Sequence, residues 1–359
     1  AIEEGLPRGF KTTLRIGPLK TNIPGISKYA KTHYRANISP FLTDVSTVVS
    51  SKGPITLNYS TPIKSGALKG IQADFNFTVL PSITVKPDGK IFKDYSSWNI
   101  IPNNKLENEK TYKIEFKGSI DNRVGSKRNA DFIKMIKVAK RSGVISTEPS
   151  NGAIDVKLYT PLIVNFETDI KEANIILTQM RGDIELNGKV VEYKPHSVFM
   201  PGKTYRVKVI ARSYLNEELE TYEFEFSTVD MKDDIWVEIN QRPIQKVVVY
   251  KGNKLIKAMR ASTGLSQPEF KTPNGYFTTK DRGMSFYSQQ HQEGGLYWVR
   301  VVGNHLIHSV PRDSDGHIIE EERKRLGYPA SHGCIRLKDE DAKWFYEYVP
   351  QGALVIIHE

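Results

Sequence analysis

Cysteine is nearly absent from this chain, whose 359 residues include only Cys334. A single thiol excludes internal disulfides and every metal site built from several cysteines. Long apolar runs are missing as well, because no stretch reaches the about 18 apolar residues that a membrane-spanning helix needs. The first residues, Ala1 to Gly5, include no initiator Met and no basic-then-apolar pattern. We therefore expect any leader or anchor to lie upstream of this chain.

Acidic residues are too few to balance the basic ones, and the formal net charge is +10. Residues 1–229 contain 33 Lys and Arg against 24 Asp and Glu, a net +9, whereas residues 230–359 contain 18 against 17, a net +1. A basic surface favours an acidic partner: nucleic acid, an anionic membrane or an anionic polymer outside the cell. Nucleic acid is disfavoured because no compact Lys/Arg cluster occurs. We predict that residues 1–229 bind an anionic polymer outside the cell, and that added salt weakens this binding.

Most of the chain has the period-two hydropathy pattern of half-buried β-strands. Apolar and polar residues alternate over 205–209 and again over 222–226. A Gly-Asn turn within 246–257 predicts a β-hairpin. One clear helix is predicted within 339–349, with aspartates capping its start and Pro350 following its end. The fold class is therefore predicted to be mainly β.

A weak internal repeat divides the first two thirds of the chain. Asn58–Ile63 parallels Asn165–Ile170, and Lys110–Ile114 parallels Lys203–Val207 in the same order. Two copies of this kind suit a pair of small β-sandwiches, with coincidence as the alternative for matches so short. We predict four segments, namely an N-terminal arm or partial element at 1–35, β-sandwich domains at 36–142 and 143–229, and a final β domain with one main helix at 230–359.

The residues best suited to chemistry surround the cysteine. The central string is Ser331-His332-Gly333-Cys334-Ile335-Arg336. A cysteine becomes a useful nucleophile when a neighbouring imidazole takes its proton. Gly333 permits a tight turn, after which the backbone N–H groups of Gly333 and Cys334 can point at a developing oxyanion. Arg336 shares a strand face with Cys334 in an extended chain, where it can hold a substrate carboxylate or support the thiolate.

The histidines near the cysteine have other interpretations. His305 lies on the strand face opposite His308 and is predicted to be structural. A zinc site of His305, His308, His332 and Cys334 suits the ligand types, but it lacks a compact pair on one face, so we expect no metal. His332 either supports its loop or takes part in proton transfer.

Two aromatic residues upstream are further candidates for substrate binding. Tyr297 and Trp298 follow the pair Gly294-Gly295, which has the composition of a hinge. We predict that they belong to a lid over the pocket, with a packed strand as the alternative.

These residues resemble the signature of the L,D-transpeptidases, the YkuD-type catalytic domain. The match consists of His308-Ser309, then Gly327, then the string 331–336. It extends to four further segments: 245–250, 272–277, 342–345 and 352–357. The resemblance covers about residues 234–359, and the preceding sandwiches resemble, more loosely, the bacterial Ig-like domains that often precede such domains.

The resemblance implies peptidoglycan chemistry. In this family the cysteine attacks the carbonyl of the third residue of a stem tetrapeptide, releases D-Ala and forms an acyl-thioester. A side-chain amine of a second stem then resolves the thioester to a 3→3 cross-link. The resemblance implies that Cys334 is the nucleophile and His308 the general base. It implies an oxyanion hole formed by the Gly333 and Cys334 amides with His332, and a Ser309 carbonyl that orients His308. It also implies that Ser331 and Arg336 bind the substrate. No cofactor is implied.

Several functions remain possible on this resemblance. Water can resolve the same thioester, which would make the chain an L,D-carboxypeptidase or a related peptidoglycan hydrolase. A sortase ranks lower because the chain lacks a Thr-Leu-x-Thr-Cys string, and a non-catalytic wall-binding protein would not need the His308 and Cys334 pair. The resemblance implies donor and acceptor stem peptides as partners, a location outside the cytoplasmic membrane, and trapping by carbapenem-type β-lactams.

Overall fold

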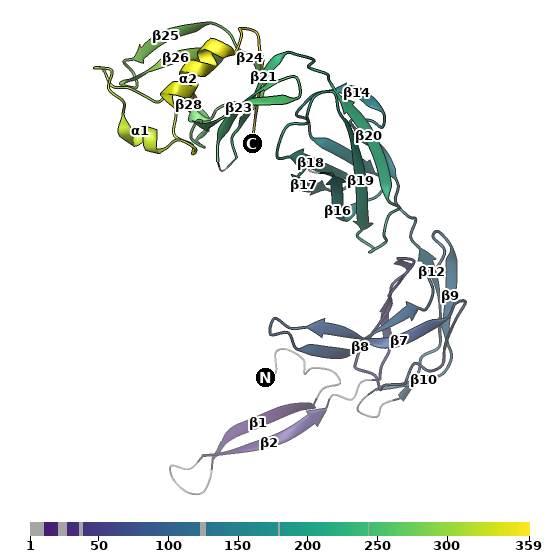
Figure 1. Ribbon diagram of the computed structural model, residues 1–359. Helices are drawn as coiled ribbons and strands as arrows, with labels where there is room; N and C mark the ends of the chain where they lie inside the picture. The colour runs from purple at the N-terminus through teal and green to yellow at the C-terminus, as the bar shows by residue number, and fades with distance from the viewer. Residues whose placement is uncertain (1–10, 21–26, 36–38, 123–126, 179, 243) are drawn as a thin grey trace. The chain divides into compact units, whose positions relative to one another are not determined.

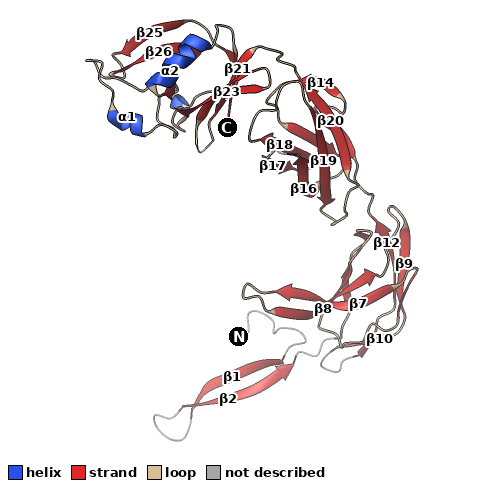
Figure 2. Cartoon of the chain, viewed as in Figure 1, coloured by secondary structure: helices blue, strands red, loops and turns tan. Residues whose placement is uncertain are grey.

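We describe a computed structural model of the chain, whose described residues are 11–20, 27–35, 39–122, 127–178, 180–242 and 244–359. It is built mainly of β-strands, as predicted, and the two α-helices of the described residues lie near the C-terminus (Figures 1 and 2). The chain divides into two compact units: Ala1–Ser142 with Arg212–Leu219, and Gly143–Ala211 with Glu220–Glu359. None of the helices in the described residues is long and apolar enough to cross a membrane.

The first unit contains two four-stranded sheets around one apolar core. One sheet has the order β3 (Leu42–Val45), β5 (Ile55–Tyr59), β8 (Ile91–Pro102), β7 (Phe77–Val85). The other has the order β4 (Val48–Val49), β12 (Phe132–Val138), β9 (Thr111–Phe116), β6 (Ile71–Ala73). Two separate hairpins are β1 (Lys11–Lys20) with β2 (Ser27–Arg35), and β10 (Ser119–Asp121) with β11 (Lys127–Asn129). The two sheets share one core of buried residues. Ile55, Leu57 and Ile100 come from the first sheet, and Ile114 comes from the second.

The second unit begins with another pair of four-stranded sheets. One has the order β13 (Val144–Glu148), β15 (Leu162–Phe166), β18 (Val190–Pro195), β17 (Gly182–Asn187). The other has the order β14 (Ala153–Val156), β20 (Tyr222–Thr228), β19 (Thr204–Ser213), β16 (Ile170–Leu177). Phe224 and Phe226 are buried while Glu223 and Glu225 are exposed, which confirms the alternation predicted for 222–226.

A nine-stranded sheet forms the rest of the second unit. Its order is β24 (Gly275–Thr278), β29 (Leu354–His358), β21 (Ile235–Asn240), β22 (Lys246–Lys251), β23 (Lys254–Ser262), β28 (Ile335–Leu337), β27 (His305–Ser309), β26 (Glu293–Val302), β25 (Arg282–Ser288). The predicted hairpin is confirmed, because Lys251 pairs with Lys254 across the Gly-Asn turn. A short 3-10 helix, η1, spans Pro268–Phe270.

Helix α2 (Asp339–Tyr348) packs its apolar side against this sheet, whereas the one-turn helix α1 (Glu320–Lys324) buries none of its residues. Ala342 and Phe345 are buried in the same core as strand residues Ile307 and Ile335, as the apolar spacing predicted. The predicted capping is wrong in detail. The residue before the helix is Lys338, no side chain caps the start, and the aspartates lie inside the first turn, where negative charge favours the helix dipole.

The second sandwich and the nine-stranded sheet share a further core within the second unit. Leu158 and Val198 of the sandwich pack with Trp236, Tyr250 and Ile356 of the sheet. The domain boundaries proposed from the sequence stay predictions. Residues on both sides of the proposed boundary at 229/230 lie in one compact unit.

The turn Arg212–Leu219 belongs to the first unit, and Glu217 anchors it there. The Ser51 amide and hydroxyl donate to its carboxylate at 2.6 and 2.7 Å, and Asn108 Nδ2 donates at 3.2 Å. Glu217 is 2% exposed, so its removal leaves buried donors without an acceptor. We expect Glu217→Ala to lower the free energy of unfolding of the first unit by about 2–3 kcal/mol.

Chemical denaturation of the full chain measures this change. The matched control is Glu218→Ala, which removes exposed ion pairs with Lys52 and Arg212 and should change the free energy by less than about 1 kcal/mol. Equal effects of the two variants would contradict the anchoring role of Glu217.

Candidate active site

Two neighbouring strands bring the predicted nucleophile and base to one cavity. Strands β27 and β28 are parallel, and His308 pairs with Arg336 across them. Cys334 immediately precedes β28, so its side chain emerges one strand away from His308. The residues lining a cavity of about 330 Å³ are Phe286, Ser288, Gln290, His291, Glu293, Arg300, Asn304, Leu306, His308, Ser331, His332, Cys334 and Arg336. The structure therefore gathers five of the predicted site residues: His308, Ser331, His332, Cys334 and Arg336.

Burial keeps both the predicted base and the predicted nucleophile uncharged. It lowers the pKa of His308 to about 3, and the positive charge of Arg336 acts in the same direction. It also raises the pKa of the Cys334 thiol, although the Leu306 backbone and Arg336 partly oppose this shift. The resting pair is therefore a neutral imidazole and a thiol, rather than an imidazolium and a thiolate.

Arg336 is held by two carboxylates that the sequence analysis missed. It is 2% exposed. Its Nη2 donates to Glu293 Oε1 at 2.5 Å, and its Nη1 donates to Glu322 and to the Ala330 carbonyl. Both terminal nitrogens thus already donate to protein groups, which argues against the predicted binding of a substrate carboxylate; that role stays a prediction. The arrangement instead ties β26 and α1 to the catalytic strand.

The loop before Cys334 is fixed by hydroxyl groups. Ser331 Oγ donates to the Cys334 carbonyl at 2.6 Å and accepts from the Gly333 amide at 3.0 Å. Thr272, which is fully buried, donates from Oγ1 to the Gly333 carbonyl at 2.8 Å. Because the Gly333 amide already has an acceptor, its predicted place in the oxyanion hole is not seen in this arrangement. The Cys334 amide stays the predicted donor.

Gly333 occupies a position that a side chain would disturb. Its φ is +114°, and a Cβ atom there would lie 2.8 Å from the His305 ring. We expect Gly333→Ala to cost about 1–2 kcal/mol of stability and to slow acylation of Cys334 by at least about tenfold, because a displacement of 1 Å at a reacting atom costs more than that. Thermal melting and the acylation rate measure the two effects.

The matched control for this variant is Gly316→Ala. Gly316 also has a positive φ, +83°, but nothing lies within 4 Å of the added Cβ. It should show the backbone cost without slowing acylation. Equal acylation by the Gly333→Ala protein and the native protein would show that the loop tolerates displacement.

The His308 ring packs closely against residues of β25 and β26. Its ring makes an edge contact with Phe286, with centroids 5.0 Å apart, and a Cβ on Gly295 would lie 2.6 Å from Nδ1. Gly295 is therefore a packing glycine within β26, not part of the predicted hinge, and Gly294 is paired there too. The Ser309 backbone opposes the effect of burial and raises the pKa of His308. The orienting role predicted for the Ser309 carbonyl stays a prediction.

His332 faces aromatic neighbours at the edge of the cavity. Its ring stacks on His291 with centroids 4.6 Å apart and makes an edge contact with Phe270 at the same separation. This packing favours the predicted loop-supporting role over proton transfer. His305 Nδ1 donates to the Val302 carbonyl at 3.1 Å, which fits its predicted structural role.

Tyr297 and Trp298 do not line the cavity. Tyr297 has φ +55° within β26, and its ring packs near Tyr346 of α2 with centroids 6.1 Å apart. The Trp298 indole donates to the Ser285 carbonyl at 3.2 Å. Their contacts are those of the packed strand that the sequence analysis kept as the alternative.

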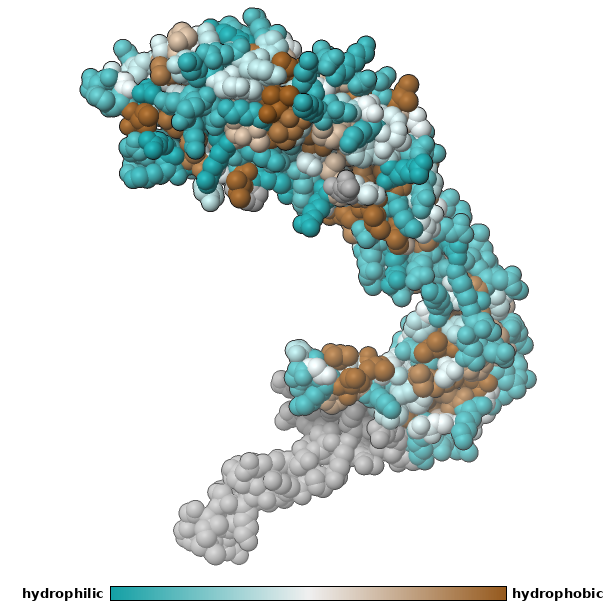
Figure 3. All heavy atoms as spheres, viewed as in Figure 1, coloured by the Kyte–Doolittle hydropathy of each residue, from teal (hydrophilic) through white to brown (hydrophobic). Residues whose placement is uncertain are grey.

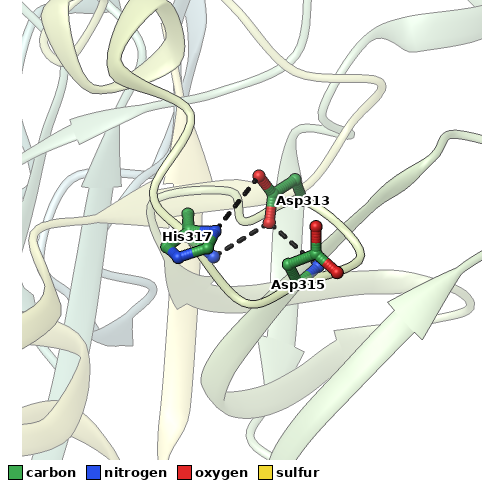
Figure 4. Close-up of side chains that lie close together, drawn as sticks. All are labelled: Asp313, Asp315 and His317. Carbon is green, nitrogen blue, oxygen red and sulfur yellow. Dashed lines mark hydrogen bonds and ion pairs between the residues drawn. The ribbon is translucent and has the colours of Figure 1, made fainter.

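A group of three potential metal ligands lies outside the cavity. Ligand atoms of Asp313, Asp315 and His317 lie within 4.8 Å of one another, and all three residues are exposed (Figure 4). Asp313 Oδ1 accepts hydrogen bonds from the amides of Asp315 and His317 at 3.0 and 2.9 Å. These bonds close a polar turn, to which we assign the cluster. The residues of the zinc alternative form no such group in the described part of the chain.

Known proteins similar to this chain share its C-terminal region. The family model of the YkuD L,D-transpeptidase catalytic domain matches residues 233–357. The candidate L,D-transpeptidase YciB of Bacillus subtilis (strain 168) is 41% identical over 127 residues, which make up 34% of this chain and 65% of YciB. The chain thus spans about two thirds of the length of this relative.

Other similar proteins match over a longer part of the chain. L,D-transpeptidase 1 of Mycobacterium tuberculosis (strain ATCC 25618 / H37Rv) is 26% identical over 233 residues, 58% of this chain and 82% of that protein. A solved structure of the L,D-transpeptidase LdtMt1 in complex with imipenem is 22% identical and covers 60% of this chain and 99% of that one, with a TM-score of 0.30.

Proposed function

We propose, from the match of residues 233–357 to the L,D-transpeptidase catalytic domain, that the chain is a cysteine-dependent acyltransferase that forms 3→3 cross-links between peptidoglycan stem peptides. The donor is a stem tetrapeptide and the acceptor is a side-chain amine of a second stem. The observation that carries the proposal is the shared cavity, which buried His308 and Cys334 both line.

In the acylation step, His308 acts as the general base. The thiol of Cys334 is protonated at rest because burial raises its pKa, so the neutral imidazole takes the proton as sulfur attacks the carbonyl of the third stem residue. A carbon–sulfur bond forms, and the bond to the terminal D-Ala breaks. The imidazolium then returns the proton to the departing amine, which leaves an acyl-thioester on Cys334 and a neutral imidazole.

In the second step, the acceptor amine attacks the thioester carbonyl. His308 takes a proton from the attacking nitrogen and returns it to the departing sulfur, so that the new amide forms and the Cys334 thiol is restored. The Cys334 amide is the proposed donor to the oxyanion in both steps. The proposed role of Glu293 and Glu322 is to fix Arg336, which helps to keep His308 neutral.

Intact-mass spectrometry of the full chain with a stem tetrapeptide tests the proposal. We expect a mass increase that corresponds to the acyl-thioester with loss of D-Ala, and its conversion to a cross-linked product when an acceptor amine is added. Release of tripeptide and D-Ala alone, with and without acceptor, would replace the transpeptidase with an L,D-carboxypeptidase. No adduct under either condition would contradict both enzymes.

Two further proposals follow from the same chemistry. Peptidoglycan lies outside the cytoplasmic membrane, so we place the protein in the cell envelope. We also propose that a carbapenem acylates Cys334, as a structural analogue of the acylating stem. The anionic wall polymer stays a prediction for residues 1–229, and binding that does not weaken with added salt would contradict it.

A further inference from the structure

The end of the β7–β8 hairpin, residues 83–93, presents apolar side chains that no core covers. Figure 3 shows hydrophobic residues gathered on this projecting hairpin. Ile83, Val85 and Ile91 are 62%, 64% and 67% exposed, and Phe92 is 46% exposed. Every residue from 83 to 94 is exposed. Exposed aliphatic residues in such a group mark a surface that is covered by a partner.

Pairing across the hairpin places the aliphatic residues on one face. Val85 pairs with Ile91, and Ile83 pairs with Lys93. Directly opposite residues of an antiparallel pair project to the same side, so these three aliphatic side chains form a continuous apolar face beside a lysine. Phe92 pairs with Thr84 on the other face.

Lysines surround this apolar tip. Residues 83–93 contain Lys86, Lys90 and Lys93 against one acidic residue, Asp88. Lys86 Nζ lies 4.4 Å from the centroid of the Phe92 ring, and Lys90 lies 3.2 Å from Asp88 in an exposed pair. The flexible stems allow these ammonium groups to reach a negative surface while the aliphatic side chains enter an apolar layer.

The turn fixes this arrangement before any partner binds. The Lys86 amide donates to the Lys90 carbonyl at 3.0 Å, and the Gly89 amide donates to the Lys86 carbonyl at 2.9 Å. Pro87 favours the first corner of the turn, and Gly89 has a φ of +77°, which glycine adopts without strain. The tip therefore loses little conformational freedom on binding.

We propose that the tip of the β7–β8 hairpin inserts into the surface of an anionic lipid bilayer. Apolar side chains buried at the level of the headgroups, together with lysines that pair with anionic lipids, are the two contributions that hold a peripheral segment on a membrane. A soluble polyanion would use the lysines and leave the aliphatic face uncovered. An anionic lipid surface would contact both the lysines and the aliphatic face of the tip.

Edge pairing with a second copy of the chain fits the hairpin less well. β7 lies at the edge of its sheet, where another strand could add. Its ladder is interrupted by a register shift between Pro81 and Ser82, and Pro81 has no amide hydrogen to donate. An irregular, proline-containing edge beside several lysines is typical of edges that resist pairing.

Co-sedimentation of the full chain with lipid vesicles tests the proposal. We expect binding to vesicles of phosphatidylglycerol and phosphatidylcholine, weaker binding to phosphatidylcholine alone, and weakening by added salt. The double variant Val85→Ser with Ile91→Ser should bind at least about tenfold more weakly. Each of the changes Lys86→Gln, Lys90→Gln and Lys93→Gln should weaken binding by about fivefold.

The matched control is the double variant Ile145→Ser with Ile154→Ser. These residues are 66% and 75% exposed and lie in the second unit, so the control removes similar apolar surface and should leave vesicle binding unchanged. All variants should unfold cooperatively at the melting temperatures of the native chain, which verifies that they fold. The proposal does not depend on the proposed function, because vesicle binding is measured without substrate.

Three outcomes would overturn the proposal. The first is native binding that does not distinguish anionic from neutral vesicles, or no binding at all. The second is undiminished binding by the Val85→Ser, Ile91→Ser variant while inorganic polyphosphate displaces the native chain, which would identify a polyanion site. The third is a dimer in sedimentation equilibrium that this variant abolishes, without vesicle binding, which would identify a second copy as the partner.

Discussion

Cys334→Ala removes all acylation of the chain by a stem tetrapeptide or a carbapenem. The native chain gains the mass of one acyl group, and the variant gains none, because Cys334 is the only thiol of the sequence and no other nucleophile is proposed in the cavity. The loss should exceed about 10³-fold, the range of effects when an enzyme loses its nucleophile. Intact-mass spectrometry of both proteins under identical conditions measures it.

The alanine at position 334 should leave the fold intact. Cys334 is half-buried, and its Sγ donates weakly to the Asn304 carbonyl at 3.7 Å. An unchanged melting temperature would therefore separate loss of chemistry from loss of structure. The same adduct on Cys334→Ala and on the native chain would contradict the assignment of Cys334 and, with it, the proposed thioester.

The sequence predicts those features that depend on neighbours along the chain. The alternation over 222–226 requires only the period of a strand, and the helix in 339–349 requires only the spacing of apolar residues. The string 331–336 likewise places Cys334 beside a histidine and a glycine. The spatial partnership of His308 and Cys334 did not follow from spacing. It came from the family resemblance, and the pairing of β27 with β28 supplies its physical basis.

Features that depend on distant contacts could not be predicted in this way. Glu293 and Glu322 lie 43 and 14 residues from Arg336, and no local pattern indicates that one guanidinium binds both. Arg336 was therefore assigned to substrate. The same limit applies to Tyr297, whose left-handed φ turns the side chain towards α2, a departure that a strand pattern does not reveal.

The joint inside the second unit was also missed, for the same reason. The Tyr276 hydroxyl donates to the Tyr159 carbonyl at 2.5 Å and accepts from the Tyr159 amide at 2.6 Å. The two tyrosines are 117 residues apart in the sequence. Tyr159 in turn stacks on His358, with ring centroids 4.4 Å apart. Tyr276 lies in a segment matched only by the family resemblance, and the predicted boundary between residues 229 and 230 separates it from Tyr159. The contacts show that both tyrosines connect the second sandwich with the nine-stranded sheet.

His308→Gln lowers the rate of Cys334 acylation by about 10²–10⁴-fold, the usual contribution of a general base. The native rate should show no loss of activity near pH 6.5, because burial lowers the pKa of His308 to about 3 and the base stays neutral there. An acidic limb near pH 6.5 in the native profile would show instead that the imidazole is charged at rest. The matched control is His317→Gln, whose side chain is 80% exposed and whose loss should leave the rate unchanged.

The same substitution changes how stability depends on pH. An unfolded histidine titrates near pH 6.5, whereas folded His308 titrates at about 3. Between these values the unfolded chain binds a proton that the folded chain excludes, so His308 makes the folded state less stable as the pH falls below about 6.5. The slope for one proton is about 1.4 kcal/mol per pH unit.

His308→Gln should therefore make the free energy of unfolding of the second unit less dependent on pH between about 6 and 4. Denaturant unfolding of the native and variant chains at several pH values measures the difference between their slopes. The contributions of other titrating groups are the same in both chains and cancel in this difference. His317→Gln should keep the native slope, because the His317 side chain is 80% exposed and does not line the cavity. Parallel slopes for the native and His308→Gln chains would mean that His308 accepts its proton in the folded state. The cavity would then hold an imidazolium, and attack would begin from a thiolate rather than from the neutral pair.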